Sequence, residues 1–300
     1  MASVKTVAVI GAGIMGRGIA HAAALGGYRT TLEDIVPASL RKAETEIRAN
    51  LEKGVELGKL DKSDADAAFS RIQFAGTVED AAREGDLVIE AVPEEMDSKI
   101  EIFTLLDKIC RPDTILASNT SSLSITEIAS VTYRPRKCLG MHFFNPVHKM
   151  KLLEIVRALE TDDETLTAAA AVGRRMGKEV VVIKESPGFI TSRINAMIGN
   201  EAFYMLQEGI ASAADIDKAL KLGLNHPMGP FELVDLVGLD TRLHILEYLH
   251  KSLGEKFRPA PLLVQHVKAG RLGRKSGRGV FEYPEAQRSN EKTAEVKTSH

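Results

Sequence analysis

The fold of this chain is decided by the stretch Thr6-Val7-Ala8-Val9-Ile10-Gly11-Ala12-Gly13-Ile14-Met15-Gly16. Its apolar, β-branched start predicts a strand, its glycines predict a turn, and the residues up to Leu25 predict a helix. In such a unit the first glycine permits the tight turn, the second lets the backbone approach a pyrophosphate, and the third lets the helix lie close to the strand. The stretch therefore predicts a dinucleotide-binding site at the start of a parallel sheet.

An acidic pair follows at the distance that a ribose-binding carboxylate requires. Gly26-Gly27 ends the predicted helix, residues 28–32 predict a second strand, and Glu33-Asp34 comes about 20 residues after the motif. A carboxylate at this place repels a 2′-phosphate, and no arginine follows directly. We therefore predict NAD rather than NADP as the cofactor, and favour Asp34 over Glu33 as the ribose ligand. The predicted cofactor-binding residues of this region are Gly11, Gly13, Ile14, Met15, Gly16 and Asp34.

Strands and helices alternate over the first 186 residues. Short apolar runs predict further strands at residues 71–74, 87–92, 114–117, 138–141, 152–156 and 180–183. A charged, alanine-rich segment at residues 38–68 predicts an inserted helical hairpin, with a break at residues 54–58. We expect residues 1–186 to form an α/β Rossmann-like domain with a mostly parallel sheet.

After Ser186-Pro187-Gly188 the sequence changes to long helical patterns. They predict an all-α C-terminal domain at residues 187–283. Its apolar residues recur at helical spacings, and we expect them to form a core or a dimer surface. The basic glycine loop at residues 273–279 follows no strand, so it is predicted to be a structural loop. Residues 284–300 are polar and predict a disordered tail.

Length and charge exclude several classes of protein. Three hundred residues suffice for two domains, and 39 basic against 41 acidic residues leave a formal charge of −2, with no basic run that would track a nucleic acid. No apolar segment reaches the roughly 18 residues of a membrane span, and no signal peptide pattern begins the chain. We expect a cytoplasmic protein. Cys110 and Cys138 lack metal-ligand spacing, so no metal site and no disulfide are predicted.

Polar side chains follow the predicted strands where a ligand of an open α/β sheet binds. Glu94 and Lys99 come after one strand, although either would also suit the surface of the next helix. Asn119 and Ser121 follow another strand and are not explained by capping, whereas Ser124 and Glu127 fit a capping box. We predict that Glu94, Lys99 and Asn119 contact the cofactor.

His142 and Glu154 lie at the two ends of a short, mostly apolar connection. A neutral imidazole can accept a proton near pH 7, and a nearby carboxylate orients the ring and stabilises the imidazolium. The alternative is that His142 is a core histidine and Glu154 a surface residue. The dinucleotide motif and the polar groups at the strand ends favour a general-base pair.

Taken together, these motifs resemble those of the 3-hydroxyacyl-CoA dehydrogenase family from Gly11 to about Tyr283. The resemblance implies a nucleotide-binding domain, a helical dimerisation domain and a cleft that holds an acyl-CoA. It implies NAD-dependent, reversible oxidation of an (S)-3-hydroxyacyl-CoA, with 3-hydroxybutyryl-CoA expected, in fatty acid or butanoate metabolism. The sequence elements that carry it are Gly11-Ala12-Gly13-Ile14-Met15-Gly16, Glu90-Ala91-Val92-Pro93-Glu94, Ser118-Asn119-Thr120-Ser121-Ser122-Leu123, Gly140-Met141-His142-Phe143-Phe144-Asn145-Pro146, Ser186-Pro187-Gly188-Phe189 and His226-Pro227-Met228-Gly229-Pro230.

By this resemblance His142 is the catalytic base, Glu154 orients it, and Ser121 binds the substrate oxygen. Asn145, Ser192 and, in the hairpin, Lys53 are the further expected substrate contacts. Ser192 departs from the family, which has asparagine at the matching position of Pro-Gly-Phe-x-x-Asn-Arg. A serine hydroxyl reaches less far than an amide and can still donate a hydrogen bond, directly or through a bridging water.

Two other functions are compatible with the same sequence. One is a dehydrogenase of another hydroxy acid or of a sugar acid on the same fold, against which the lysine-rich hairpin argues. The other is a non-catalytic NAD(H)-binding protein, which the complete set of His142, Glu154 and Ser121 disfavours.

Overall fold

The protein is described here by a computed structural model that covers residues 4–284. The chain divides into two compact units, the first ending at Phe189 and the second beginning at Ile190. From residue 285 onward the predicted tail lies outside the described residues. Within residues 4–284, no helix combines the length and the apolar character needed to cross a bilayer.

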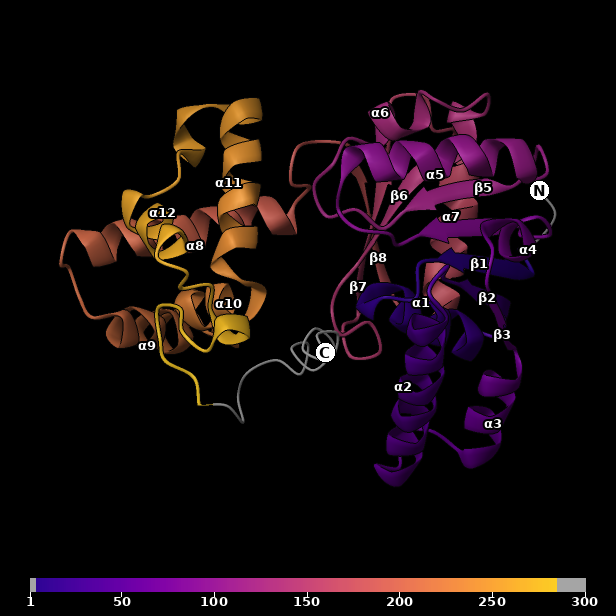
Figure 1. Cartoon of the computed structure of the whole chain (residues 1–300), viewed down its shortest axis with the longest axis horizontal. Helices are drawn as coiled ribbons and strands as arrows, with labels where there is room; N and C mark the ends of the chain where they lie inside the picture. Colours follow the sequence, from indigo (N-terminus) through magenta and orange to yellow (C-terminus); the bar gives the residue numbers. More distant parts are fainter. Residues whose placement is uncertain (1–3, 285–300) are drawn as a thin grey trace, which may run out of the picture. The chain divides into compact units, whose positions relative to one another are not determined.

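The first unit is built on one eight-stranded sheet (Figure 1). Its strand order is β3-β2-β1-β4-β5-β6-β7-β8, and all neighbours are parallel except β6 and β7. The predicted Rossmann-like fold with a mostly parallel sheet is confirmed. The strands are β1 (Thr6–Ile10), β2 (Arg29–Glu33), β3 (Ile72–Ala75), β4 (Leu87–Glu90), β5 (Ile115–Ser118), β6 (Cys138–Phe143), β7 (Leu152–Arg157) and β8 (Glu179–Lys184).

Helices cover both faces of this sheet and create two separate cores. The central strands β4 and β5 are buried along their whole length, as their nearly continuous apolar sequences require. Apolar residues of α1, α2, α3 and α7 form one core, and those of α4, α5 and α6 form the other. The helices are α1 (Ile14–Leu25), α2 (Pro37–Glu56), α3 (Lys62–Ser70), α4 (Val78–Ala82), α5 (Met96–Ile109), α6 (Ile125–Ala129) and α7 (Asp163–Arg175), with a 3-10 turn η1 (Pro135–Lys137).

The three glycines of the first turn are glycine for different physical reasons. Gly11 has φ +97°, a conformation that side chains disfavour. A Cβ on Gly16 would lie 1.7 Å from the carbonyl oxygen of Gly11, so the close contact between helix and turn admits only glycine. A Cβ on Gly13 would meet no heavy atom within 4 Å. Gly11 and Gly16 are therefore required by the fold, whereas Gly13 leaves open space at the start of α1.

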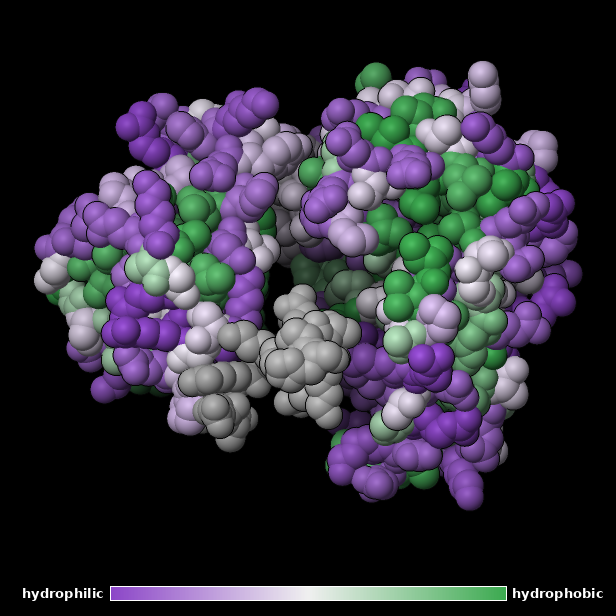
Figure 2. All heavy atoms as spheres, viewed as in Figure 1, coloured by the Kyte–Doolittle hydropathy of each residue, from purple (hydrophilic) through white to green (hydrophobic). Residues whose placement is uncertain are grey.

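The helical hairpin α2–α3 differs from the prediction at one point. The expected break at residues 54–58 begins later, because α2 continues through Gly54 to Glu56. A glycine costs only about 1 kcal/mol inside a helix, and Leu60 from the turn packs at 3.5 Å from the position of a Gly54 Cβ. The hairpin surface seen in Figure 2 is mostly hydrophilic, as its charged sequence requires.

The second unit is helical, as predicted. It contains α8 (Thr191–Gln207), α9 (Ala213–Gly223), α10 (Pro230–Val237), α11 (Leu239–Leu253) and α12 (Pro261–Lys268), with 3-10 turns η2 (Glu255–Phe257) and η3 (Arg274–Ser276). Two buried aspartates organise it. Asp217 accepts the N–H groups of Phe231 and Glu232 at the start of α10. Asp235 accepts those of Val280 and Phe281, so the basic glycine loop wraps around a buried carboxylate.

Lys178, His148 and His21 form a cluster of basic groups at the loop that follows β6. The Lys178 ammonium donates to the carbonyl oxygens of Val147 and Met150. The rings of His148 and His21, on α1, have centroids 6.0 Å apart. His21 is buried, and neither ring nitrogen has a hydrogen-bond partner among the described residues. Burial, followed by the neighbouring His148 and Lys178, lowers the pKa of His21 to about 4.

Substitution of the glycines separates their roles. We expect Gly16→Ala to lower the free energy of unfolding by at least about 3 kcal/mol, because its methyl group would overlap a backbone carbonyl. Gly13→Ala should change it by less than about 0.5 kcal/mol, because the methyl group has space. Denaturant unfolding followed by circular dichroism measures both. Equal losses for the two variants would contradict this account.

His21 makes the stability depend on pH. Between its ordinary value of 6.5 and about 4, the unfolded chain binds a proton on His21 and the folded chain does not, so stability falls as pH falls. Wild type should lose about 2 kcal/mol more than His21→Gln between pH 7.5 and 5.0, measured by urea unfolding. The control is His244→Gln, at an exposed position of α11. Identical pH dependence in wild type and His21→Gln would refute the role of His21.

Candidate functional site

The reversal of direction between β6 and β7 brings His142 and Glu154 together. They are directly opposite each other in the antiparallel register, so their side chains lie on the same face of the sheet. The Nδ1 atom of His142 lies 2.7 Å from Oε2 of Glu154. His142 is 6% exposed and Glu154 1% exposed, so the pair is shielded from water. The arrangement fixes the orientation of the imidazole and leaves Nε2 for other partners.

Aromatic rings and an amide complete the surroundings of His142. The ring of Phe144 has its centroid 4.4 Å from that of the imidazole, and the ring of Phe189 lies at 5.6 Å. Asn119, at the end of β5, accepts the N–H of Phe143 at 2.9 Å through Oδ1. Asn119 thus connects the ends of two neighbouring strands, next to the histidine.

Glu94 is the centre of a second group of polar side chains. Its Oε1 accepts hydrogen bonds from the Thr120 hydroxyl at 2.6 Å, the Ser121 N–H at 2.8 Å and the Ser121 hydroxyl at 3.0 Å. The structure therefore brings together Glu94 and Ser121, which the sequence placed after different strands. Because a hydroxyl that donates one hydrogen bond can still accept two, Ser121 remains able to accept one from a ligand.

Lys99 is next to Glu94 and is fully buried. Its Nζ donates to Glu90 Oε1 at 2.8 Å and lies 3.4 Å from Glu94 Oε2. The other oxygen of Glu90 accepts the Ser118 hydroxyl at 2.6 Å. In this structure the buried Lys99 ammonium holds the Glu94 carboxylate and is not exposed to a ligand.

Glu90 and its partner Ser118 were not predicted as functional residues. The signal was present, since Glu90 is an acid inside the otherwise apolar run at residues 87–92. A buried charge needs a partner of opposite sign. That rule could have paired Glu90 with a cation, although the sequence does not say which one.

The glycine turn and the end of β2 meet at the start of α1. Asp34 accepts the N–H of Ala12 at 2.9 Å and that of Val36 at 2.8 Å. Glu33 is 2% exposed, and burial together with the neighbouring Asp34 raises its pKa to about 7. Both acids contact the glycine turn: Glu33 accepts the N–H of Gly11 through its backbone carbonyl at 2.9 Å, and Asp34 accepts that of Ala12 through its carboxylate.

These residues fit a dinucleotide. The first turn of α1 carries no acidic residue and no side-chain cap, and the space at Gly13 is open. The backbone N–H groups at the start of α1 therefore suit a pyrophosphate. Ile14 and Met15 are the first two residues of the helix, directly after Gly13.

Three further residues were predicted to contact the substrate. Lys53 is exposed on α2 and pairs with Glu56 at 2.8 Å. Asn145 is exposed in the loop after β6, where it precedes a cis proline. Ser192 belongs to α8 in the second unit. Their contact with a substrate stays a prediction.

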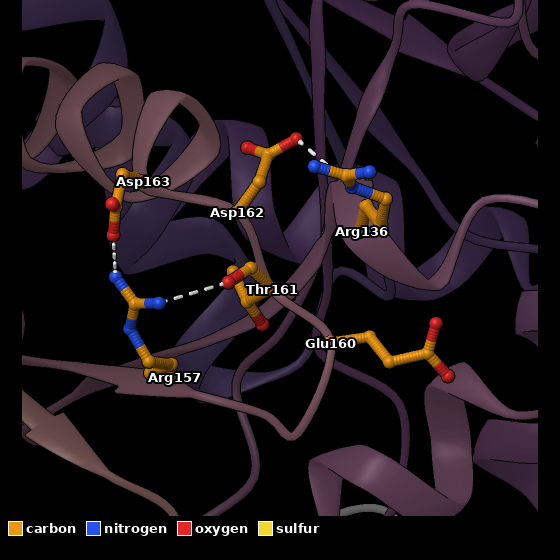
Figure 3. Close-up of a pocket in the computed structure, with 6 residues that line it drawn as sticks. All are labelled: Arg136, Arg157, Glu160, Thr161, Asp162 and Asp163. Carbon is orange, nitrogen blue, oxygen red and sulfur yellow. Dashed lines mark hydrogen bonds and ion pairs between the residues drawn. The ribbon is translucent and has the colours of Figure 1, made fainter.

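A polar pocket lies near the amino end of β6 and the carboxyl end of β7, whereas His142 is near the carboxyl end of β6 (Figure 3). Arg157 points to Asp163 and to the carbonyl of Thr161, and Arg136 points to Asp162. Its cations are thus paired with groups of the protein itself. Among residues 4–284, no group of three or more His, Cys, Asp or Glu side chains is arranged to hold a metal ion.

Comparison with known proteins identifies the family. Residues 6–186 match the profile of the 3-hydroxyacyl-CoA dehydrogenase NAD binding domain, and residues 188–283 match that of the 3-hydroxyacyl-CoA dehydrogenase C-terminal domain. The cofactor is accordingly NAD.

Individual relatives cover almost the whole chain. A probable 3-hydroxybutyryl-CoA dehydrogenase of Bacillus subtilis is 47% identical over 94% of this chain and 98% of its own. The crystal structure of (S)-3-hydroxybutyryl-CoA dehydrogenase from Ralstonia eutropha has a TM-score of 0.91 at 43% identity, over 94% of this chain and 100% of its own. A diketoreductase that acts on dicarbonyl compounds has a TM-score of 0.81 at 31% identity, over 94% of this chain and 100% of its own. The chain therefore belongs to the 3-hydroxyacyl-CoA dehydrogenase family of NAD-dependent oxidoreductases.

Proposed function

We propose that this protein oxidises (S)-3-hydroxybutyryl-CoA to acetoacetyl-CoA, reversibly and with NAD. The observation that carries the proposal is the buried pair of His142 and Glu154 at the carboxyl end of β6, in a chain whose full-length relatives are named for this activity. Ligands of open α/β sheets bind at this edge. The same proposal places the enzyme in the cytoplasm, in fatty acid or butanoate metabolism.

His142 acts as the general base. Its Nδ1 proton is directed to Glu154, so Nε2 carries the lone pair that accepts the proton of the substrate 3-hydroxyl group. Glu154 then stabilises the imidazolium at 2.7 Å, in a site with little water to screen the attraction. In the reverse direction the imidazolium returns this proton to the 3-oxo oxygen. Bound NAD would supply the acceptor for the hydride of carbon 3.

Ser121 and Glu94 position the substrate and the cofactor in this proposal. The single proton of the substrate hydroxyl is directed to His142, so Ser121 binds the substrate oxygen by turning its own hydroxyl proton from Glu94 to that oxygen. Glu94 keeps the Thr120 hydroxyl and the Ser121 N–H. The N–H groups of the turn from Gly11 to Gly16, including those of Ile14 and Met15, would hold the pyrophosphate, and Asp34 would hold the ribose. Asn119 keeps the ends of β5 and β6 together beside the nicotinamide position.

The CoA part and the assembly belong to the same proposal. In this proposal Lys53 on α2 and Ser192 on α8 contact the acyl-CoA. The second unit exposes apolar residues of α8 and its start, with Ile190 50%, Ile194 53% and Met197 38% exposed. Their spacing of four and three places them along one helix face, which suits a homodimer interface.

A second candidate is a dehydrogenase that accepts a dicarbonyl compound without CoA. The similarity to a diketoreductase favours it, since that protein shares the fold. The 47% identity to a probable 3-hydroxybutyryl-CoA dehydrogenase favours the thioester instead. The two candidates differ in whether turnover requires CoA.

The first assay follows NADH oxidation with acetoacetyl-CoA and with free acetoacetate. We expect kcat/KM to be on the order of 10²-fold higher for the thioester, because binding energy from the CoA portion contributes to catalysis. Replacing NADH with NADPH should lower kcat/KM by about tenfold or more, since a 2′-phosphate would lie beside Asp34. Equal rates with acetoacetate would favour the second candidate, and turnover with neither compound would refute both.

Substitution of the histidine tests the mechanism. We expect His142→Gln to lower kcat by about 10²–10⁴-fold, the usual contribution of positioned acid–base catalysis. The Kd of NADH, measured by fluorescence titration, should stay within about twofold of wild type, because no cofactor contact is assigned to this side chain. Parallel loss of NADH binding and turnover would instead show that His142 is a structural residue.

A further inference from the structure

Phe189 has a backbone conformation that a bulky residue rarely adopts. Its φ is +51°, in the left-handed region where Cβ crowds the following carbonyl group. Among the described residues other than glycine, Asn225 is the one that shares a positive φ, and asparagine tolerates it. Such strain persists only where the surroundings fix it, and it often marks a functional position.

The segment before Phe189 is held to the first unit. The carboxylate of Glu185 accepts the Ser124 hydroxyl at 2.5 Å and the Thr126 N–H at 2.9 Å. The N–H of Phe189 donates to the carbonyl of Ser186 at 2.9 Å and closes a turn. The chain then passes directly into α8, the first helix of the second unit. Phe189 is thus the last residue that the first unit holds.

The ring of Phe189 is buried in the first unit. It is 4% exposed and packs with Ile125, Val156, Ala158 and, at the edge of the cluster, Ile183. Val156 lies two residues after Glu154 on β7, so the ring is inserted beside the strand that supplies the carboxylate.

The same ring is a neighbour of the imidazole of His142. The two centroids are 5.6 Å apart and the planes are tilted by 56°. Glu154 holds Nδ1, and Phe144 contacts the ring at 4.4 Å. Two of these three neighbours come from β7 and the segment that follows β6. The third comes from residue 189, where a glycine would relieve the strained backbone but leave one side of the imidazole without a neighbour.

We propose that Phe189 is a positioning residue for His142. The Phe189 ring keeps the imidazole aligned with Glu154, and this role explains why the strained backbone of residue 189 is retained. The inference rests on the proposed function of His142 as general base. A simpler explanation is that residue 189 only completes the turn that begins at Ser186. The two explanations differ in what a glycine does, because glycine suits the turn and lacks the ring.

The test compares Phe189→Leu and Phe189→Gly with wild type. We expect both to lower kcat with acetoacetyl-CoA by roughly tenfold, while KM for the thioester and for NADH stays within about twofold, because a small misplacement of a catalytic group affects turnover more than binding. A second readout needs no substrate. The low-field proton resonance of His142 Nδ1, assigned by its loss in His142→Gln, should shift or broaden in both variants.

The matched control is Phe103→Leu. Phe103 is a fully buried ring of α5, in a core cluster that contains neither His142 nor Phe189, so its truncation lowers the melting temperature without removing a neighbour of His142. It should leave kcat within about twofold and the resonance unchanged. Phe189→Gly with wild-type kcat and resonance would overturn the proposal. If wild type itself fails to reduce acetoacetyl-CoA, the proposed function is wrong, and the resonance alone decides the role of Phe189.

Discussion

The antiparallel pairing of β6 with β7 is the constraint on which the site depends. Up to β6 the central strands run in one direction, and each contributes a polar group near its carboxyl end, namely Glu90, Ser118 and His142. The reversal at β7 places Glu154 opposite His142, in the interior of a strand that is paired on both sides, with β6 and with β8. A carboxylate in such a place has little freedom, so the imidazole that it holds has little freedom either.

Much of the fold could be predicted because it is encoded in short patterns. The apolar runs and glycines at residues 6–16 require a strand, a turn and a helix in contact, and the overlap of a Gly16 Cβ with the Gly11 carbonyl shows why no other residue fits. His142 and Glu154 could be paired because the connection between them is short and apolar. The end of α2 was misplaced, since packing of Leu60 outweighs the low helix propensity of Gly54.

The parts of the site that the sequence does not show are contacts between side chains from distant segments. Lys99 follows a strand end and looks like a surface cation, yet it is buried because Glu90 is available nine residues earlier. The ring of Phe189 reaches His142 from a position 47 residues away in the chain, through a turn whose φ value no local pattern reveals. Such contacts follow from the tertiary structure and carry no periodic signal.

The buried ion pair of Lys99 and Glu90 needs an explanation other than stability. Desolvation of two charges usually offsets their attraction, so an apolar pair of similar volume would serve the core as well. What an apolar pair cannot do is reach Glu94, whose Oε2 lies 3.4 Å from the Lys99 ammonium. Its other oxygen, Oε1, is held by Thr120 and Ser121. We interpret the pair as a means of fixing Glu94. Glu90 on the sheet holds the Lys99 ammonium, which holds one carboxylate oxygen of Glu94, while Thr120 and Ser121 hold the other.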